Sequence, residues 1–221
     1  MSQRRLKVTD DEIFAAAQRA MTRRGPHELT LAHIGAEAGV SPGRLVQRFG
    51  SKRALLLALA ERFAGSAGTV FDGLRTAHRR PLEALRAYAM CMADLASTPD
   101  ALSRNLAYLQ IDLTDPEFRA HLQANARATR LEIESLLRAA VREGVLQRDA
   151  DPHTLARTIE AVINGSLMTW ACYRKGSAAA WIRFDVDAVL QPYLSVDPGS
   201  KAPASGRFSR RRTRRRSVPR E

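Results

Sequence analysis

Apolar side chains recur along this chain at the three- and four-residue steps of an α-helix. Ile13, Ala17 and Ala20 set this spacing in the first segment, and it returns in each later apolar segment. No run of β-branched residues indicates a strand. The pattern predicts an all-α protein of about nine helices.

Local capping signals place the helix boundaries. A side chain that can accept a hydrogen bond from a free amide of the first turn precedes six of the predicted helices: Thr9, Thr30, Ser41, Ser51, Asp115 and Asp151. Glycines mark four predicted ends: Gly25, Gly39, Gly50 and Gly144. We expect the fourth helix to run unbroken from residue 52 to about residue 75. Longer amphipathic helices are expected after Pro81, with apolar stripes over residues 82–95, 102–109, 118–136, 155–163 and 182–193.

Charge and composition divide the chain into three parts. Residues 1–62 contain eleven Lys and Arg against six Asp and Glu, residues 63–195 contain fifteen of each, and residues 196–221 contain nine against two. Basic segments on either side of a neutral body suggest a phosphate-bearing partner. The last part is rich in Pro, Gly, Ser and Arg. It cannot bury enough apolar surface to offset its chain entropy, so we expect it to be disordered.

The two short helices on either side of Gly39 fit a helix-turn-helix, in which the second helix leaves the turn steeply enough to enter a major groove. Small residues at Gly35 and Ala36 would let these helices approach closely. The expected inward positions are apolar: Ile34, Ala38, Val40, Leu45 and Phe49. The exposed side of the second helix would then carry Ser41, Gly43, Arg44, Val46, Gln47 and Arg48.

The segment LTLAHIGAEAGVSPGRLVQRFGSKRALLLALAE resembles the DNA-binding domain of TetR-type transcriptional regulators. The resemblance covers residues 8–62 and continues through residues 63–195 by layout only. It implies a helix-turn-helix domain over 8–62, a helical ligand-binding and dimerisation domain over 63–195, and a homodimer that binds a palindromic operator on double-stranded DNA. Ligand-released repression is the function that it favours.

The resemblance also assigns phosphate contacts. A Thr like Thr30 caps the second helix and contacts phosphate, and Lys52, in the FGSK segment, reaches a phosphate from the head of the fourth helix. The family pattern has an aromatic residue where this chain has Val46, and a histidine where it has Arg48. Arg48 would replace a neutral phosphate donor with a permanent charge. Val46 would touch a thymine methyl group.

Arg44 and Gln47 are the candidates for base contacts. Each presents two hydrogen-bonding groups to a base edge, Arg preferring guanine and Gln adenine, and a good pair discriminates by about 1 to 3 kcal/mol. The alternative for either side chain is a solvated helix face. His33 is either a further contact to DNA or a surface histidine.

In the larger domain the resemblance implies a pocket, among the fifth to eighth predicted helices, for a small apolar effector. The candidate lining is apolar with a few polar groups: Tyr88, Met92, Asn105, Tyr108, Asp112, Asn125, Thr129, Met168, Thr169 and Trp170. Core packing is the alternative for each of them. No cofactor is implied.

Small residues at Asn164, Gly165 and Ser166 lie between apolar stretches of the eighth predicted helix. They suit either a dimer interface built with the ninth helix or packing within one chain. The eight arginines between residues 207 and 220 either add sequence-independent phosphate contacts or form a solvated tail without function. Membrane attraction is not expected, because no amphipathic anchor accompanies the tail.

Other classes of protein are not favoured by the sequence. No apolar signal-peptide core or run of about 18 apolar residues is visible, so a cytoplasmic protein is expected. Cys91 and Cys172 have no metal-ligand spacing and are expected to be buried thiols. No catalytic constellation is visible, so no catalytic residue or metal ligand is assigned. The remaining alternatives are a ligand-independent DNA-coating protein dominated by the tail, and an enzyme whose site is assembled from distant residues.

Overall fold

The regular secondary structure of the described residues is helical. The computed structural model describes residues 8–94 and 97–195, and these ranges contain ten α-helices, one 3-10 turn and an isolated bridge between Leu146 and Leu194. The helices are α1 (Asp10–Arg23), α2 (Leu31–Ala38), α3 (Pro42–Phe49), α4 (Lys52–Ala64), α5 (Ala67–Ala77), α6 (Pro81–Asp94), α7 (Pro99–Thr114), α8 (Pro116–Arg142), α9 (Pro152–Tyr173) and α10 (Ala178–Leu190), followed by the 3-10 turn Gln191–Tyr193. The all-α prediction is confirmed. The expected disorder of residues 196–221 concerns a segment outside the described residues.

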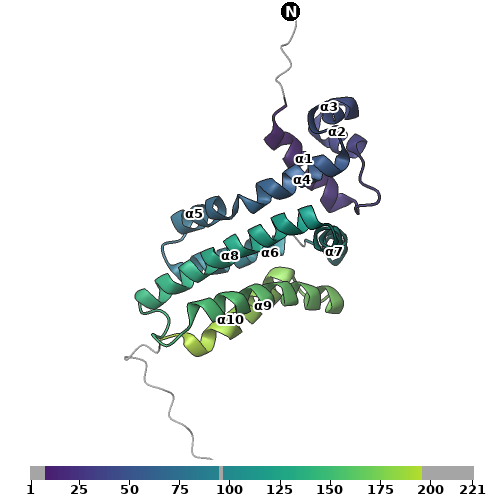
Figure 1. The fold of residues 1–221 in the computed structure, drawn as a ribbon. Coiled ribbons are helices and arrows are strands. Elements are labelled where there is room, and N and C mark those ends of the chain that lie inside the picture. Colours follow the sequence, from purple (N-terminus) through teal and green to yellow (C-terminus); the bar gives the residue numbers. More distant parts are fainter. Residues whose placement is uncertain (1–7, 95–96, 196–221) are drawn as a thin grey trace, which may run out of the picture.

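The helices are arranged in two units (Figure 1). The N-terminal unit, α1 to α4, gathers at one end of the molecule around its own buried cluster. In the C-terminal unit, α5 to α10, the long α8 runs between α4 and α5 on one side and α9 on the other. A second buried cluster fills this unit. The expected boundary between residues 62 and 63 falls inside α4.

The helix starts carry the caps that the sequence predicts. Thr9 accepts a hydrogen bond from the Glu12 amide at 3.2 Å, and the Glu12 carboxylate accepts one from the Thr9 amide at 2.7 Å. This reciprocal pair is the predicted capping box. The other predicted caps also accept amide hydrogen bonds at their helix starts: Thr30, Ser41, Ser51, Asp115 and Asp151.

The expected fourth helix is broken into two. α4 and α5 are bent by 44° relative to each other at a break that contains Gly65 and Ser66, and Gly/Ser pairs are common sites of helix kinks. The described chain therefore has ten helices where about nine were expected. No single helix in the described ranges is long and apolar enough to span a membrane, and α4 and α5 meet that test only as this bent pair.

The two cysteines differ from expectation. Cys91 on α6 and Cys172 on α9 are both exposed, so the prediction of buried thiols is wrong. On α9 the apolar pattern continues beyond the core-facing residues onto an outward face that includes Met168 and Tyr173. Helical spacing alone did not separate that outward face from the core stripe.

The turn between α2 and α3 depends on two glycines. Gly39 adopts a left-handed conformation with φ of 68°, and the Val40 amide donates to the Gly35 carbonyl at 2.9 Å. A Cβ atom on Gly35 would lie 2.5 Å from the Val40 carbonyl oxygen, closer than real Cβ atoms come. The predicted close approach is confirmed at Gly35, whereas Ala36 is exposed and lies outside it.

Replacing Gly35 by alanine should therefore destabilise the protein. Ala normally stabilises a helix interior relative to Gly by about 0.5 to 1 kcal/mol, but here the backbone must move, and we expect a net loss of about 1 to 3 kcal/mol in the free energy of unfolding. Gly43→Ala is the matched control, because a Cβ there meets nothing within 4 Å. Urea unfolding of both variants measures the difference. Equal stability of the two variants would contradict the close approach.

Candidate DNA-binding face and the contacts behind it

α3 is held to the N-terminal unit by one fully buried side chain. Leu45 is 1% exposed and is the only residue of this helix that is buried. Full burial of a leucine contributes about 1.5 to 3 kcal/mol. The other residues expected to face inward also join the cluster. Ile34 is buried, and three are partly buried: Ala38, Val40 and Phe49. The six residues expected on the exposed side are all exposed: Ser41, Gly43, Arg44, Val46, Gln47 and Arg48.

Arg44 and Gln47 project from this exposed side without partners. In the part of the chain that the structure describes, neither the Arg44 guanidinium nor the Gln47 amide makes a hydrogen bond or an ion pair with another residue. Ser41 caps the helix just before them and accepts from the Arg44 amide at 3.4 Å. Both side chains therefore keep their full hydrogen-bonding capacity for an external partner.

Arg48 lies on the same side but is already paired. Its Nε atom lies 2.6 Å from the Asp10 carboxylate, and its Nη1 atom donates to the Val8 carbonyl at 2.7 Å. These contacts tie the end of α3 to the start of α1. They also neutralise the positive charge that the sequence assigns to a phosphate contact.

Thr30 is placed by its capping contact with α2, and Lys52 by contacts to the loop between α1 and α2. The Thr30 hydroxyl accepts from the His33 amide at 3.2 Å, which leaves its O–H free to donate. The Lys52 ammonium donates to the carbonyls of Pro26 at 3.2 Å and Leu29 at 2.8 Å. An ammonium has three donors, so one remains. Lys52 therefore fixes this loop against α4 and still has a proton to offer.

His33 is half-buried, so it is not a freely exposed surface histidine. Its Nδ1 atom is buried with no hydrogen-bond partner in the described structure.

Apart from the candidate DNA-binding face, α7 docks on the end of α1. Arg104 Nε donates to the Thr22 carbonyl at 2.8 Å, and the Tyr108 hydroxyl donates to the Arg24 carbonyl at 3.0 Å. These are among the carbonyls that a helix end leaves without helical partners. The Tyr108 ring joins the buried cluster of the N-terminal unit, and burial raises the pKa of Tyr108 to about 12.

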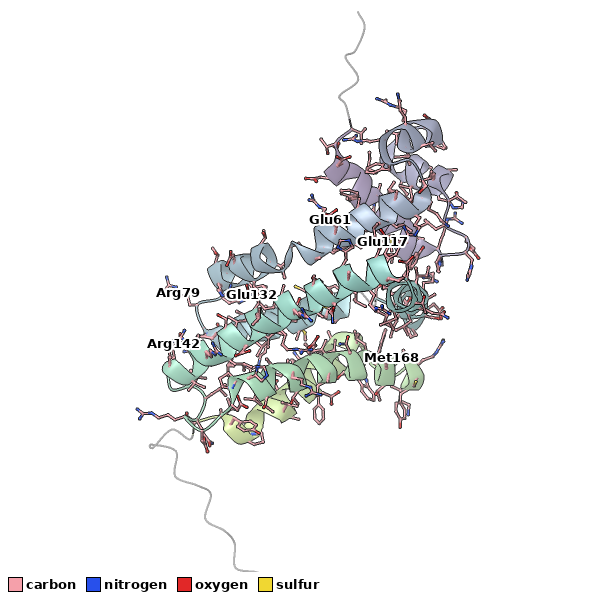
Figure 2. The ribbon with its side chains drawn as sticks, in the orientation of Figure 1. Glu61, Arg79, Glu117, Glu132, Arg142 and Met168 are labelled. Carbon is pink, nitrogen blue, oxygen red and sulfur yellow. The ribbon has the colours of Figure 1, made fainter. Side chains whose placement is uncertain are left out.

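A second contact joins α4 to the start of α8. The Arg53 guanidinium donates to both carboxylate oxygens of Asp115, at 2.7 and 3.0 Å, and to Glu117 at 2.5 Å. Figure 2 shows Glu117 at the end of α8 that lies beside α4. The Arg53 hydrogen bonds hold the pKa of Asp115 below its ordinary value. We call the α1–α7 and α4–α8 contacts together the interdomain joint.

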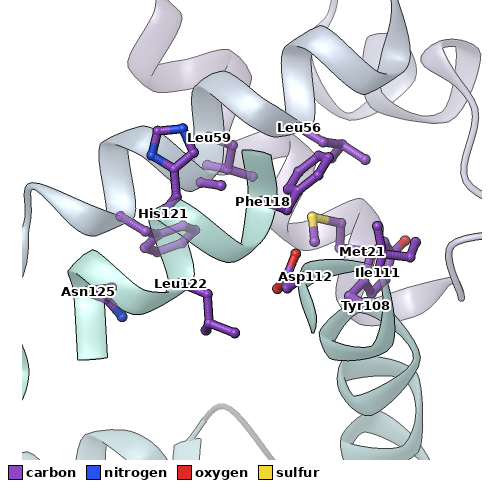
Figure 3. Close-up of a pocket in the computed structure, with 12 residues that line it drawn as sticks. Met21, Leu56, Leu59, Tyr108, Ile111, Asp112, Phe118, His121, Leu122 and Asn125 are labelled. Atoms are coloured by element: carbon purple, nitrogen blue, oxygen red, sulfur yellow. The ribbon is translucent and has the colours of Figure 1, made fainter. Parts of the chain in front are cut away.

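The structure brings together only part of the candidate pocket lining. Tyr108, Asp112 and Asn125 line a cavity inside the interdomain joint (Figure 3). The others lie elsewhere in the C-terminal unit. Trp170 is buried in the core, and the Tyr88 ring packs at a tilt against Phe71 with ring centroids 4.6 Å apart. Thr129 is half-buried on α8. The remaining four are half-buried or exposed: Met92, Asn105, Met168 and Thr169.

The outward faces of α9 and α10 carry exposed apolar residues. Met168 on α9 is 47% exposed and Phe184 on α10 is 75% exposed, and Figure 2 labels Met168 on α9. Ser166 is buried and donates to Asp185 of α10 at 2.6 Å, whereas Asn164 and Gly165 are exposed. The small residues of α9 therefore lie on two faces of the helix. Ser166 packs within the chain, and Asn164 and Gly165 are exposed to solvent.

Sequence reasoning missed the side chains that join the two units. Arg53 and its partner Asp115 are 62 residues apart, and Arg104 lies 82 residues from Thr22. No local pattern marks such pairs. Within the described ranges, no group of three or more His, Cys, Asp or Glu side chains is arranged to hold a metal ion.

Comparison with family models matches both units. Residues 13–59 match the model described as bacterial regulatory proteins, tetR family, and residues 107–184 match the tetracyclin repressor-like C-terminal domain. No curated protein sequence matches the chain.

Solved structures with the same fold cover most of the chain. SmeT, the repressor of the Stenotrophomonas maltophilia multidrug efflux pump SmeDEF, is 25% identical, with a TM-score of 0.61 over 90% of this chain and 96% of SmeT. The SmeT–triclosan complex gives 25% identity and a TM-score of 0.62 over 90% and 97%. Thermus thermophilus FadR, a transcriptional repressor in complex with lauroyl-CoA, is 23% identical, with a TM-score of 0.52 over 88% and 100%.

Releasing Arg48 from Asp10 should strengthen binding to any duplex DNA. Asp10→Asn removes the paired carboxylate, and we expect affinity for a random-sequence duplex to rise about two- to fivefold, as the value of an exposed ion pair suggests. Asp11→Asn is the control. It removes an equal charge from the same helical turn, but Asp11 pairs with Arg62 and not with Arg48. Fluorescence anisotropy at fixed salt measures both. Equal gains would mean that only net charge matters.

Proposed function

We propose a function from the premise that this chain belongs to the tetR family of bacterial regulatory proteins. The protein is a repressor that binds a palindromic operator as a homodimer. A small-molecule effector releases it from the operator. The observation that carries the proposal is α3. This eight-residue helix buries only Leu45 and presents the unpaired Arg44 and Gln47 outward.

Base contacts would come from Arg44, Gln47 and Val46. The first two can each bond a base edge through two groups, and Val46, 48% exposed, offers methyl groups to a thymine. Such contacts give sequence preference, whereas contacts to phosphate give position and affinity. The short length of α3 fits a helix that enters a major groove.

Phosphate contacts would come from the free donors beside α3. The Thr30 hydroxyl and the third donor of Lys52 remain available, and His33 and Arg48 are further candidates. Thr30 also stands at the N-terminus of α2, and Lys52 is the first residue of α4. Helix N-termini attract anions through their free amides and their dipole.

The operator contact is tested with duplexes recovered by selection from a random library. Arg44→Ala and Gln47→Ala should each weaken binding to the selected operator by about 1 to 3 kcal/mol, with little change on random DNA. Thr30→Ala is the comparison, because loss of a phosphate contact weakens both duplexes alike. Equal losses on operator and random DNA for the α3 variants would rule out base readout by these residues.

A homodimer would use the outward faces of α9 and α10. Exposed Met168 and Phe184 lie on these two helices, and the hollow between them includes Gly165 and Val189. Exposed apolar residues that gather on neighbouring helices are typical of an interface. A two-fold dimer presents two copies of α3, as a palindromic operator requires.

Gly165→Glu should therefore split the dimer without unfolding the chain. A side chain at Gly165 meets nothing within 4 Å in the single chain, so we expect a folded monomer with at least about tenfold weaker operator binding. Gly73→Glu on α5 is the matched control, since it also meets nothing within 4 Å. Sedimentation velocity at micromolar concentration reports the assembly state. A wild-type monomer that binds the operator at full strength would exclude this architecture.

The proposal of an effector is supported by a relative. SmeT, at 25% identity, has been solved with triclosan, a small molecule. This chain has a largely apolar cavity in its interdomain joint, where three of the ten candidate lining residues meet. The chemistry of that cavity is developed next.

A further inference from the structure

The interdomain joint contains a partly open cavity of about 230 Å³ between its two sets of contacts. α1 and α4 of the N-terminal unit form one side, and α7 and α8 of the C-terminal unit form the other (Figure 3). Its walls include Met21, Ala60, Phe63, Tyr108, Asp112 and Phe118. A ligand in this space would touch both units at once.

The size and lining of the cavity fit a small aromatic body. A dry cavity of about 150 Å³ lined by apolar side chains already holds a benzene ring. The present cavity is larger and has aromatic walls at Phe63 and Phe118. One ring with a short substituent, or two fused rings, matches this space.

Asp112 is the exception to this apolar lining. Figure 3 shows its carboxylate turned into the cavity, between Phe118 on one side and Met21 and Tyr108 on the other. Among the residues that the structure describes, nothing donates a hydrogen bond to this carboxylate or forms an ion pair with it. Burial raises the pKa of Asp112 above its ordinary value, as expected for a carboxylate that lacks a nearby cation.

The neighbouring acidic groups are already neutralised. Asp115, three residues further along, and Glu117 both pair with Arg53. The Tyr108 hydroxyl donates away from the cavity, to the Arg24 carbonyl. Asp112 is thus a partly buried acceptor that no described side chain of its surroundings satisfies, and such a group is stabilised by a charged donor.

We propose that this cavity in the interdomain joint is the effector site, and that its ligand is a small aromatic monocation, such as a protonated primary amine on a one- or two-ring body, with Asp112 as its counter-ion. The inference rests on the ligand-released repression proposed above and names the chemistry of that ligand. The aromatic body fills the apolar walls, and the ammonium group donates to the Asp112 carboxylate.

The placement of the site also provides its coupling to DNA. Because the walls come from both units, the free energy of ligand binding depends on how α1 and α4 sit against α7 and α8. The same relative position sets where α3 stands in the dimer. By linkage, a ligand that changes operator affinity has its own affinity changed by the operator by the same factor.

Three matched compounds test the charge preference. Isothermal titration calorimetry of the full chain uses 2-naphthylmethylamine as the cation, 2-naphthylmethanol as the neutral analogue and 2-naphthoate as the anion. We expect the cation to bind about tenfold or more tightly than the alcohol, because a hydrogen bond to a charged group is stronger than a neutral one, and the anion to bind most weakly. Equal affinities of cation and alcohol would overturn the proposal.

Two variants assign the preference to this cavity. Asp112→Asn should reduce the affinity of the amine to that of the alcohol and leave the alcohol unchanged. Asp149→Asn, which removes an exposed carboxylate outside the cavity, should change neither. Ala60→Trp fills the cavity and should abolish binding of both compounds while thermal unfolding shows a folded protein. Retained preference in Asp112→Asn, or retained binding in folded Ala60→Trp, would place the site elsewhere.

Operator binding separates this inference from the function on which it rests. With the amine present, operator affinity of the wild type should fall at least about fivefold, and that of Asp112→Asn should not. If the protein binds the operator and the amine does not change that affinity, the proposed effector site is wrong and the proposed repressor function stands. Failure to bind any selected operator would overturn the repressor, and calorimetry would still report whether the cavity selects the cation.

Discussion

Helices of eight residues do not hold their shape in water on their own. Isolated helices shorter than about 12 to 15 residues are marginal even with favourable sequences, and both α2 and α3 have eight. Their form and position are therefore imposed by neighbours, through the buried Leu45, the close approach at Gly35 and the Lys52 bonds to the preceding loop. The order of the candidate DNA-binding face therefore depends on the packing beneath it.

That packing does not end at the N-terminal unit. Tyr108 of α7 is part of the same buried cluster as Leu45, and Arg104 bonds to the end of α1. On the other side, Arg53 joins α4 to the start of α8. The N-terminal unit is thus held by the C-terminal unit at two separate points. A change in the position of α7 or α8 therefore displaces α1 and α4, against which α3 packs.

Local features of the sequence predicted much of this arrangement. Caps such as Thr9 and Ser41, the turn at Gly39 and the inward positions of α2 and α3 follow from interactions within a few residues, so they could be predicted. The exposure of Cys91 and the Arg53 pairs depend on how distant helices meet, and a single sequence does not show that. The candidate lining illustrates the limit. Asp112 and Asn125 were named, but their cavity lies between the units and not inside the larger one.

The position of Tyr108 bears on how such proteins can be recombined. A segment ending near residue 62 looks like a complete module in the sequence, yet one side chain of its core is supplied from α7. Transplanting residues 8–62 onto the body of another family member would leave a hole the size of a phenol ring and an uncapped carbonyl at Arg24. The transferable unit of this protein is therefore the helix-turn-helix domain together with the face of α7 that completes it.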